Sequence, residues 1–146
     1  MSRIHRFDHV GITVADLDTA SAFFVDLGFE VEGRTFLEGE FLDTVIGIPG
    51  SRTEMVVLRP PDGGTRLELT RFLRPDHTPG SPAASATRLG LSNVSFEVDG
   101  LQSILDRLAV NGYRLIGGVG EYERFWLMAS VRGPEGIIVN LAERIA

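Results

Sequence analysis

Apolar and polar residues alternate in the same order in two stretches of the chain that begin 84 residues apart. The first, FDHVGITVADL, spans residues 7–17, and the second, LSNVSFEVDGL, spans residues 91–101. A period of two is typical of a strand with one buried face, so each stretch predicts such a strand. The aligned apolar residues are Val10 and Val94, Ile12 and Phe96, Val14 and Val98, and Leu17 and Leu101. The polar residue between them is His9 in one copy and Asn93 in the other.

Helical spacing follows each of these predicted strands. An acidic residue stands in the capping position, either Asp16 or Asp18 in the first copy and Asp99 in the second. Gly28 and Gly112 follow the helical patterns, and glycine is favoured at the left-handed position that ends a helix. The predicted helix faces are Leu17, Ala20, Phe24 and Leu27 in the first copy, and Leu101, Ile104, Leu105 and Leu108 in the second.

The ends of the two copies also match. PDGGTRLELT at residues 61–70 is similar to PEGIIVNLA at residues 134–142, with one residue more after the turn. Glu68 then aligns with Asn140, an offset of 72, so the second copy is 12 residues shorter than the first. We interpret each copy as a βαβββ module. In the second, we predict strands at residues 93–99, 113–117, 124–131 and 137–142.

The repeat defines the domain organisation. Residues 1–72 form the first predicted module and residues 90–146 the second, together making one paired domain. Residues 73–89 are rich in Pro, Gly, Ser and Ala and have no periodicity, which is typical of a linker. A chance match of two amphipathic segments is the alternative, but it leaves the aligned glycines, caps and turns unexplained.

Composition narrows the classes of partner. The net charge is −6, the pI is about 5.0 and no basic cluster occurs, which disfavours nucleic acid and membrane surfaces as partners. The absence of cysteine excludes disulfides, thiolate metal sites and cysteine nucleophiles. There is neither a signal-like segment nor an apolar run long enough to span a bilayer, so we expect a cytoplasmic protein.

Four motifs together resemble the vicinal oxygen chelate superfamily: DHVGITVADLDTASAFF, LGFEVEG, RLELT and VRGPEGIIVNLAE. This superfamily includes glyoxalase I, methylmalonyl-CoA epimerase, bleomycin resistance proteins and extradiol dioxygenases. The resemblance covers residues 7–143. It implies an α+β fold in which two βαβββ modules form a cupped, barrel-like mixed sheet around a cavity. It also implies a small organic molecule as the ligand, and a homodimer.

The resemblance places the superfamily's metal ligands at four positions, namely His9, Glu68, Asn93 and Asn140. The metal-dependent lyases have histidine or a carboxylate where this chain has Asn93 and Asn140. Catalytic zinc takes three protein ligands, and a neutral amide oxygen is a weak donor for it. Mg²⁺ and Mn²⁺ accept amide oxygens, so His9 and Glu68 with a weakly held divalent metal remain one alternative. A degenerate site without metal is the other.

His9 and Glu68 are also the candidate catalytic residues. Each has a structural alternative, because a histidine inside a sheet is often simply hydrogen-bonded and Glu68 could pair with Arg66 beside solvent. Glu68 lies between two leucines, and an acid in an apolar cavity has a raised pKa that suits it to proton transfer.

Four further residues are candidates for binding a ligand. Asn93 and Asn140 offer uncharged donors and acceptors, which suit a neutral polar molecule. Arg66 shares the face of Glu68, and Trp126 could stack on a planar ligand or belong to the core. Residues 36–50, which carry most of the first module's extra length, form either a flap over the cavity or a loop packed outside it.

Two functions remain in competition. The first is a binding protein that holds a small organic molecule, as the metal-free resistance members of the superfamily do. The second is a lyase, isomerase or epimerase with Glu68 as the base and His9 as the acid or metal partner. An extradiol dioxygenase is disfavoured, because its iron site needs two histidines and a carboxylate.

Overall fold

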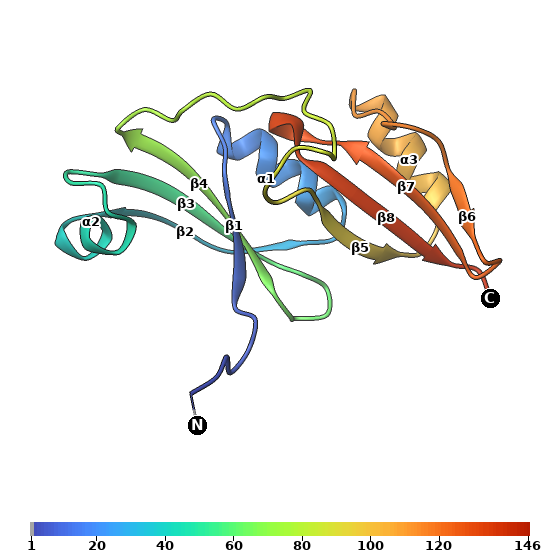
Figure 1. Ribbon diagram of the computed structural model, residues 1–146, viewed down its shortest axis with the longest axis horizontal. Coiled ribbons are helices and arrows are strands. Elements are labelled where there is room, and N and C mark those ends of the chain that lie inside the picture. Colours follow the sequence, from blue (N-terminus) through green and yellow to red (C-terminus); the bar gives the residue numbers. More distant parts are fainter. Residues whose placement is uncertain (1) are drawn as a thin grey trace. The chain divides into compact units, whose positions relative to one another are not determined.

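The computed structural model describes residues 2–146, and the chain divides into two compact units, residues 1–79 and 80–146. Each unit contains its own open four-stranded sheet (Figure 1). The first unit contains β1 (His9–Thr13), α1 (Leu17–Asp26), β2 (Glu30–Glu38), α2 (Glu40–Ile46), β3 (Arg52–Arg59) and β4 (Arg66–Arg74). The second contains β5 (Val94–Val98), α3 (Leu101–Val110), β6 (Gly120–Tyr122), β7 (Trp126–Arg132), a 3₁₀ turn (Pro134–Gly136) and β8 (Ile138–Arg144).

The two sheets have the same topology. Their strand orders are β1-β4-β3-β2 and β5-β8-β7-β6. The first strand of each unit pairs in parallel with the last, and the other pairs are antiparallel. The predicted α+β class and the two βαβββ modules are therefore confirmed. None of the helices in residues 2–146 has the length and apolar character needed to cross a bilayer.

Strand register confirms the alignment of the two copies at both offsets. Gly11 on β1 is level with Glu68 on β4, and Ser95 on β5 is level with Asn140 on β8. Gly11 and Ser95 are 84 residues apart, whereas Glu68 and Asn140 are 72 apart. The deletion in the second copy therefore removes residues between equivalent strands and leaves the pairing unchanged.

Each unit has a core between its helix and one face of its sheet. In the first unit, Phe24 of α1 and Leu69 of β4 have no exposed surface. In the second unit, Leu141 of β8 has none and Leu108 of α3 is 1% exposed. Strand residues alternate between this face and the other, so His9 of β1 and Glu68 of β4 lie on the face away from α1. This second face is called the open face below.

The helix ends agree with the predicted caps, with one exception. Asp16 accepts a hydrogen bond from the Thr19 N–H and so caps α1. Gly28 (φ +113°) and Gly112 (φ +88°) follow the helices in the left-handed region, as predicted. The prediction for Asp99 is wrong, because Gly100 is the capping residue of α3. The Glu143 carboxylate of β8 accepts a hydrogen bond from the Gly100 N–H at 2.7 Å instead.

The predicted strand at residues 113–117 is also wrong. Only an isolated bridge joins Leu115 to Val131, and regular pairing with β7 resumes in β6 at Gly120 and Met128. Four residues separate Leu115 from Gly120, but only two separate Met128 from Val131. The segment between Leu115 and Gly120, which contains Gly117 and Gly118, is therefore longer than the facing segment of β7 and forms a bulge.

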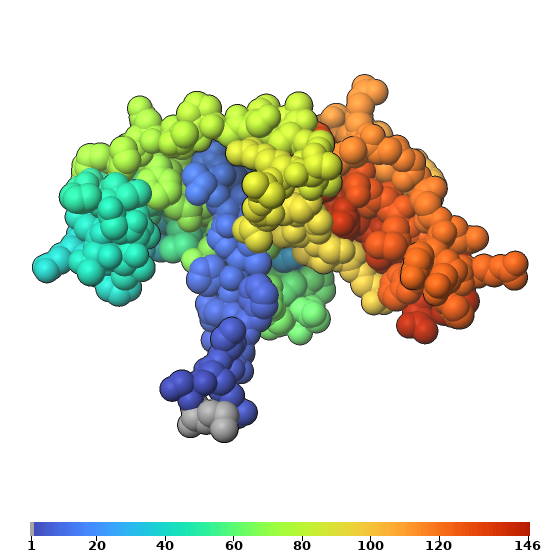
Figure 2. Space-filling view, viewed as in Figure 1, coloured from blue at the N-terminus to red at the C-terminus, as the bar shows by residue number. Residues whose placement is uncertain are grey.

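Residues 36–50, predicted to be a flap or a packed loop, contain α2 and the end of β2. Figure 2 shows α2 as a lobe at one end of the first unit. Phe41 is 72% exposed on this helix. Asp43 accepts hydrogen bonds from the Gly50 N–H and from the N–H and hydroxyl of Ser51, and the Ser51 hydroxyl lowers the pKa of Asp43. The helix is thereby tied to the start of β3.

Part of the predicted linker packs on the second unit. The Arg132 guanidinium donates hydrogen bonds to the carbonyl oxygens of Pro82, Ala84 and Gly136. Gly136 approaches Pro82 so closely that an added Cβ would lie 2.4 Å from the Pro82 oxygen. The contact therefore requires glycine at position 136.

The β6–β7 hairpin turn offers a stability prediction. Glu123 (φ +47°) and Arg124 (φ +63°) both occupy the left-handed region, which asparagine and glycine adopt at lower cost. We expect the double substitution Glu123→Asn with Arg124→Gly to raise the free energy of unfolding by about 1–2 kcal/mol. Urea denaturation followed by circular dichroism measures this change. An unchanged or lower midpoint would contradict the strain argument.

Candidate functional site: an imidazole between two carboxylates

The open face of the first sheet brings His9 and Glu68 together. His9 is the first residue of the edge strand β1, and Glu68 lies on the neighbouring strand β4. Gly11, level with Glu68, has no side chain, and a Cβ built there meets nothing within 4 Å. His9 can therefore approach Glu68 diagonally across the parallel pair.

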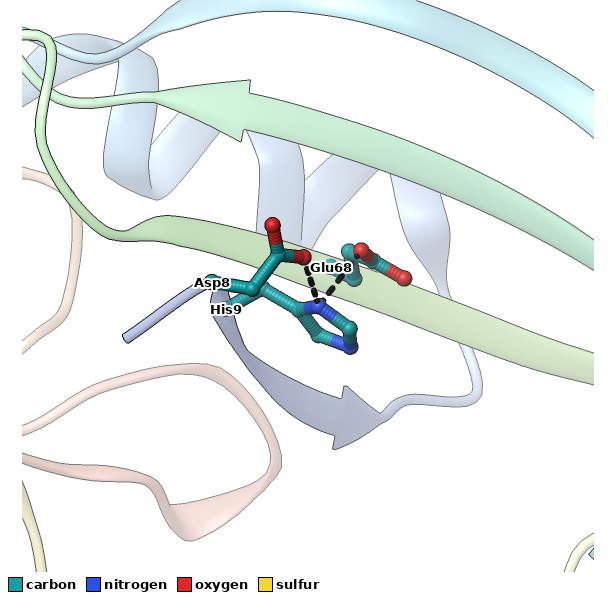
Figure 3. A group of neighbouring side chains, drawn as sticks. All are labelled: Asp8, His9 and Glu68. Atoms are coloured by element: carbon teal, nitrogen blue, oxygen red, sulfur yellow. Dashed lines mark hydrogen bonds and ion pairs between the residues drawn. The ribbon is translucent and has the colours of Figure 1, made fainter. Parts of the chain in front are cut away.

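The His9 Nδ1 atom lies between two carboxylates (Figure 3). It is 3.0 Å from Glu68 Oε2 and 2.7 Å from Asp8 Oδ2. The side chains of Glu68, His9 and Asp8 are 23%, 39% and 60% exposed. Arg6 donates a hydrogen bond to the other oxygen of Asp8 at 3.0 Å. The cluster is thus open to solvent on one side and accessible to a ligand.

Charge determines which hydrogen bonds the imidazole makes. The hydrogen bond with His9 lowers the pKa of Asp8, so this carboxylate is ionised at neutral pH. An ionised carboxylate only accepts hydrogen bonds. When both carboxylates are ionised, Nδ1 therefore carries the proton they share, and a neutral His9 has its lone pair on Nε2. This arrangement can transfer a proton or bind a cation.

Arg66 does not pair with Glu68, so the alternative that joined them is wrong. Its guanidinium is 3.1 Å from Glu32 Oε2 and also donates to the carbonyl oxygens of Gly63 and Gly64. Glu68 consequently has His9 as its ion-pair partner within residues 2–146. The carboxylate is available to the open face rather than neutralised by an arginine.

The equivalent positions in the second unit are chemically different. Asn93 is exposed just before β5, and Asn140 lies on the open face of β8. The Ser130 hydroxyl donates a hydrogen bond of 2.6 Å to the Asn140 side-chain oxygen. Trp126 is half-buried on β7, with the Arg144 guanidinium 5.7 Å from its ring centre. One groove of this unit runs along residues 113–116, and its lining includes neither Asn140 nor Trp126.

Asp8 is the site residue that the sequence analysis missed. Strand alternation places residue 8 on the face opposite His9, which explains the omission. The structure begins β1 at His9, so Asp8 lies outside the regular strand and its side chain turns back to the ring. An acid directly before a histidine at the start of an edge strand is the signal that could have identified it.

The donor set of the cluster fits a divalent metal. Asp8, His9 and Glu68 each offer a ligand atom, and these atoms all lie within 4.8 Å of one another. Three protein ligands of these types, with an open position, are what catalytic zinc sites have. The open face of the first unit therefore offers three potential metal ligands, one more than the His9 and Glu68 predicted from the sequence.

Comparisons with known proteins agree on one family. A model of the Glyoxalase/Bleomycin resistance protein/Dioxygenase superfamily matches residues 6–141. A crystal structure of a glyoxalase family protein from Bacillus cereus is 36% identical, covers 99% of this chain and 97% of its own, and has a TM-score of 0.95.

Two less similar structures support the fold alone. A glyoxylase/bleomycin resistance protein/dioxygenase domain from Frankia sp. is 22% identical over 99% of both chains, with a TM-score of 0.64. Glyoxalase I from Zea mays is 16% identical over 97% of this chain and 45% of its own, with a TM-score of 0.67. No curated protein matches the chain.

Proposed function

Because the chain belongs to the glyoxalase/bleomycin resistance protein/dioxygenase superfamily, we propose that it binds a small organic molecule at the open face of its first-module sheet. The observation that carries this proposal is the His9–Glu68 contact of 3.0 Å on that face. Both side chains are partly exposed and neither is neutralised by Arg66. A ligand with hydrogen-bond donors or a positive charge suits two carboxylates that share one imidazole.

We propose that the open face of the second module, taken by itself, offers hydrogen bonds to a ligand rather than metal ligands. Asn140 already accepts a bond from Ser130, and its amide N–H groups remain suited to an acceptor on the ligand. Asn93 offers a second uncharged amide, and Trp126 a ring for stacking. Arg66, two residues before Glu68 on β4, would contribute to ligand binding from the same face. In this proposal the superfamily's metal site is degenerate in the second module.

Replacing Glu68 by glutamine is expected to weaken binding of the organic ligand at least about tenfold, because the charge-assisted bond becomes a neutral one. A panel of polar metabolites, screened by native mass spectrometry and thermal shift, would supply the ligand. Glu40→Gln, which removes an exposed carboxylate on α2, is the matched control and should bind as the parent does. Equal affinity of the two variants would exclude this face as the binding site.

An enzyme is the second candidate, and the same contact favours it. Glu68 and His9 lie within hydrogen-bond reach of each other and can act as base and acid in a lyase, isomerase or epimerase reaction. The test is whether the protein converts a bound ligand to product. Glu68→Gln should abolish this turnover and leave the free energy of unfolding unchanged. Stoichiometric binding without turnover would favour the binding protein. The homodimer and the cytoplasmic location stay predictions.

A further inference from the structure

We propose that Asp8 completes a divalent transition-metal site that lies entirely within the first module, with His9 and Glu68 as the other protein ligands. The resemblance implies a metal shared between ligands of both modules, and it assigns no role to position 8. The inference concerns the same face as the proposed function. It does not depend on the organic ligand, so either idea can fail without the other.

The separations between the ligand atoms suit one ion. Bonds from zinc to imidazole nitrogen and carboxylate oxygen are about 2.0–2.2 Å long, so the ligand atoms of a tetrahedral site lie about 3.3–3.6 Å apart. Nδ1 of His9 is 2.7 Å from Asp8 Oδ2 and 3.0 Å from Glu68 Oε2. An ion in place of the shared proton would therefore need only small side-chain movements.

The charge of the cluster favours a dication over a proton. Two carboxylates face one imidazole, and a single proton on Nδ1 divides its hydrogen bond between them. Arg6 offsets part of the charge, but it contacts only Oδ1 of Asp8 and leaves Oδ2 for the ion. Arg66 is engaged by Glu32. A metal ion neutralises both carboxylates at once, as a proton cannot.

The proposed set of three metal ligands needs no residue of the second module. Its two equivalent residues are amides, and amide oxygens are weak donors for zinc. The Ser130 hydroxyl already bonds the side-chain oxygen of Asn140 at 2.6 Å. That bond uses one of the two lone pairs of the amide oxygen, whereas Asp8 offers a charged ligand atom already beside His9.

The donor set also predicts which ions bind best. One imidazole with two carboxylates should follow the general affinity order, with Zn²⁺ and Ni²⁺ above Mn²⁺. Mg²⁺ should bind weakest, because it prefers oxygen ligands and keeps its water. The order separates this site from an exposed acidic patch, which would not discriminate Zn²⁺ from Mg²⁺ in this way.

Isothermal titration of each metal chloride into untagged, chelator-treated and desalted protein tests the proposal. We expect about one Zn²⁺ per chain, and Asp8→Asn should weaken binding at least about tenfold because a charged ligand becomes a neutral one. Glu40→Gln, which removes an exposed carboxylate outside the cluster, is the matched control and should bind Zn²⁺ as the parent does. Asn93→Ala and Asn140→Ala test whether the ion is shared with the second module, and we expect both to bind within about twofold of the parent. Zn²⁺ should also shift the ¹⁵N resonance of His9 Nδ1, which reports coordination directly.

Three outcomes would overturn the inference. No binding of any of the four ions means that the cluster holds only a proton. Unchanged affinity in Asp8→Asn, with the fold intact by circular dichroism, means that Asp8 is not a ligand. A loss in Asn93→Ala or Asn140→Ala as large as that in Asp8→Asn means that the ion is shared between modules. None of these results bears on binding of the organic molecule, which is measured separately on metal-free protein.

Discussion

Replacing Phe24 by alanine is expected to lower the free energy of unfolding by about 3–5 kcal/mol. The side chain has no exposed surface and packs edge-on against Phe23 and Phe29, with ring centres 5.1 and 5.8 Å away. Alanine would leave a cavity between α1 and its sheet that the surrounding strands cannot fill. Urea denaturation followed by far-ultraviolet circular dichroism measures the loss.

Val25→Ala is the control for Phe24→Ala, because the next residue of the same helix is 44% exposed. Its cost should be about 0.5 kcal/mol or less. The position equivalent to Phe24 in the second copy is Leu108, which is 1% exposed, and Leu108→Ala should cost about 2–5 kcal/mol. A cost below about 1 kcal/mol for Phe24→Ala would contradict the assignment of this residue to the core.

The repeat could be predicted because its signals are local. Alternation, helical spacing and terminal glycines each depend on residues within one turn or one strand, and the pairing of Gly11 with Glu68 recurs at Ser95 and Asn140. The cap of α3 could not be predicted, because its signal is not local. The carboxylate that binds the first amides of α3 comes from Glu143, 43 residues after Gly100. Nothing in the sequence near α3 indicates it.

The candidate site could be predicted only in part. Position and residue type identified His9 and Glu68, but strand alternation excluded Asp8. That rule applies inside a strand, and Asp8 lies one residue outside it on the edge of the sheet. The pairing of Arg66 with Glu32 also could not be predicted, because it depends on a bulge in β2 between Val31 and Gly33.

The two copies differ at two positions that face each other on neighbouring strands, and these differences explain why their open faces differ in chemistry. Val57 on β3 is level with Glu68, and in the second copy Ser130 on β7 is level with Asn140. Valine offers Glu68 no hydrogen bond, so its carboxylate turns to His9. Serine bonds the oxygen of Asn140 and leaves its N–H groups. The first copy therefore presents a charged carboxylate and the second a neutral amide. This difference fits the proposal that the first module binds a cation or transfers a proton, whereas the second only forms hydrogen bonds.

Replacing Gly136 by alanine is expected to destabilise the second unit by about 2–5 kcal/mol and to release the segment around Pro82. Two costs combine at this position. The backbone has φ +78°, which an L side chain rarely adopts, and the new Cβ would lie 2.4–2.7 Å from three backbone atoms of Pro82. Because those are backbone atoms, the segment must move, and the bonds from Arg132 to Pro82 and Ala84 would be lost.

Gly112→Ala separates the two costs of Gly136→Ala. Gly112 has a similar φ of +88°, but a Cβ there meets nothing within 4 Å. It should therefore show only the conformational cost, about 1–2 kcal/mol. Urea denaturation compares the two variants, and trypsin cleavage after Arg88 should be faster in Gly136→Ala alone. Equal destabilisation and equal cleavage would mean that the contact with Pro82 contributes nothing, and that residues 82–84 are held to the second unit by Arg132 without it.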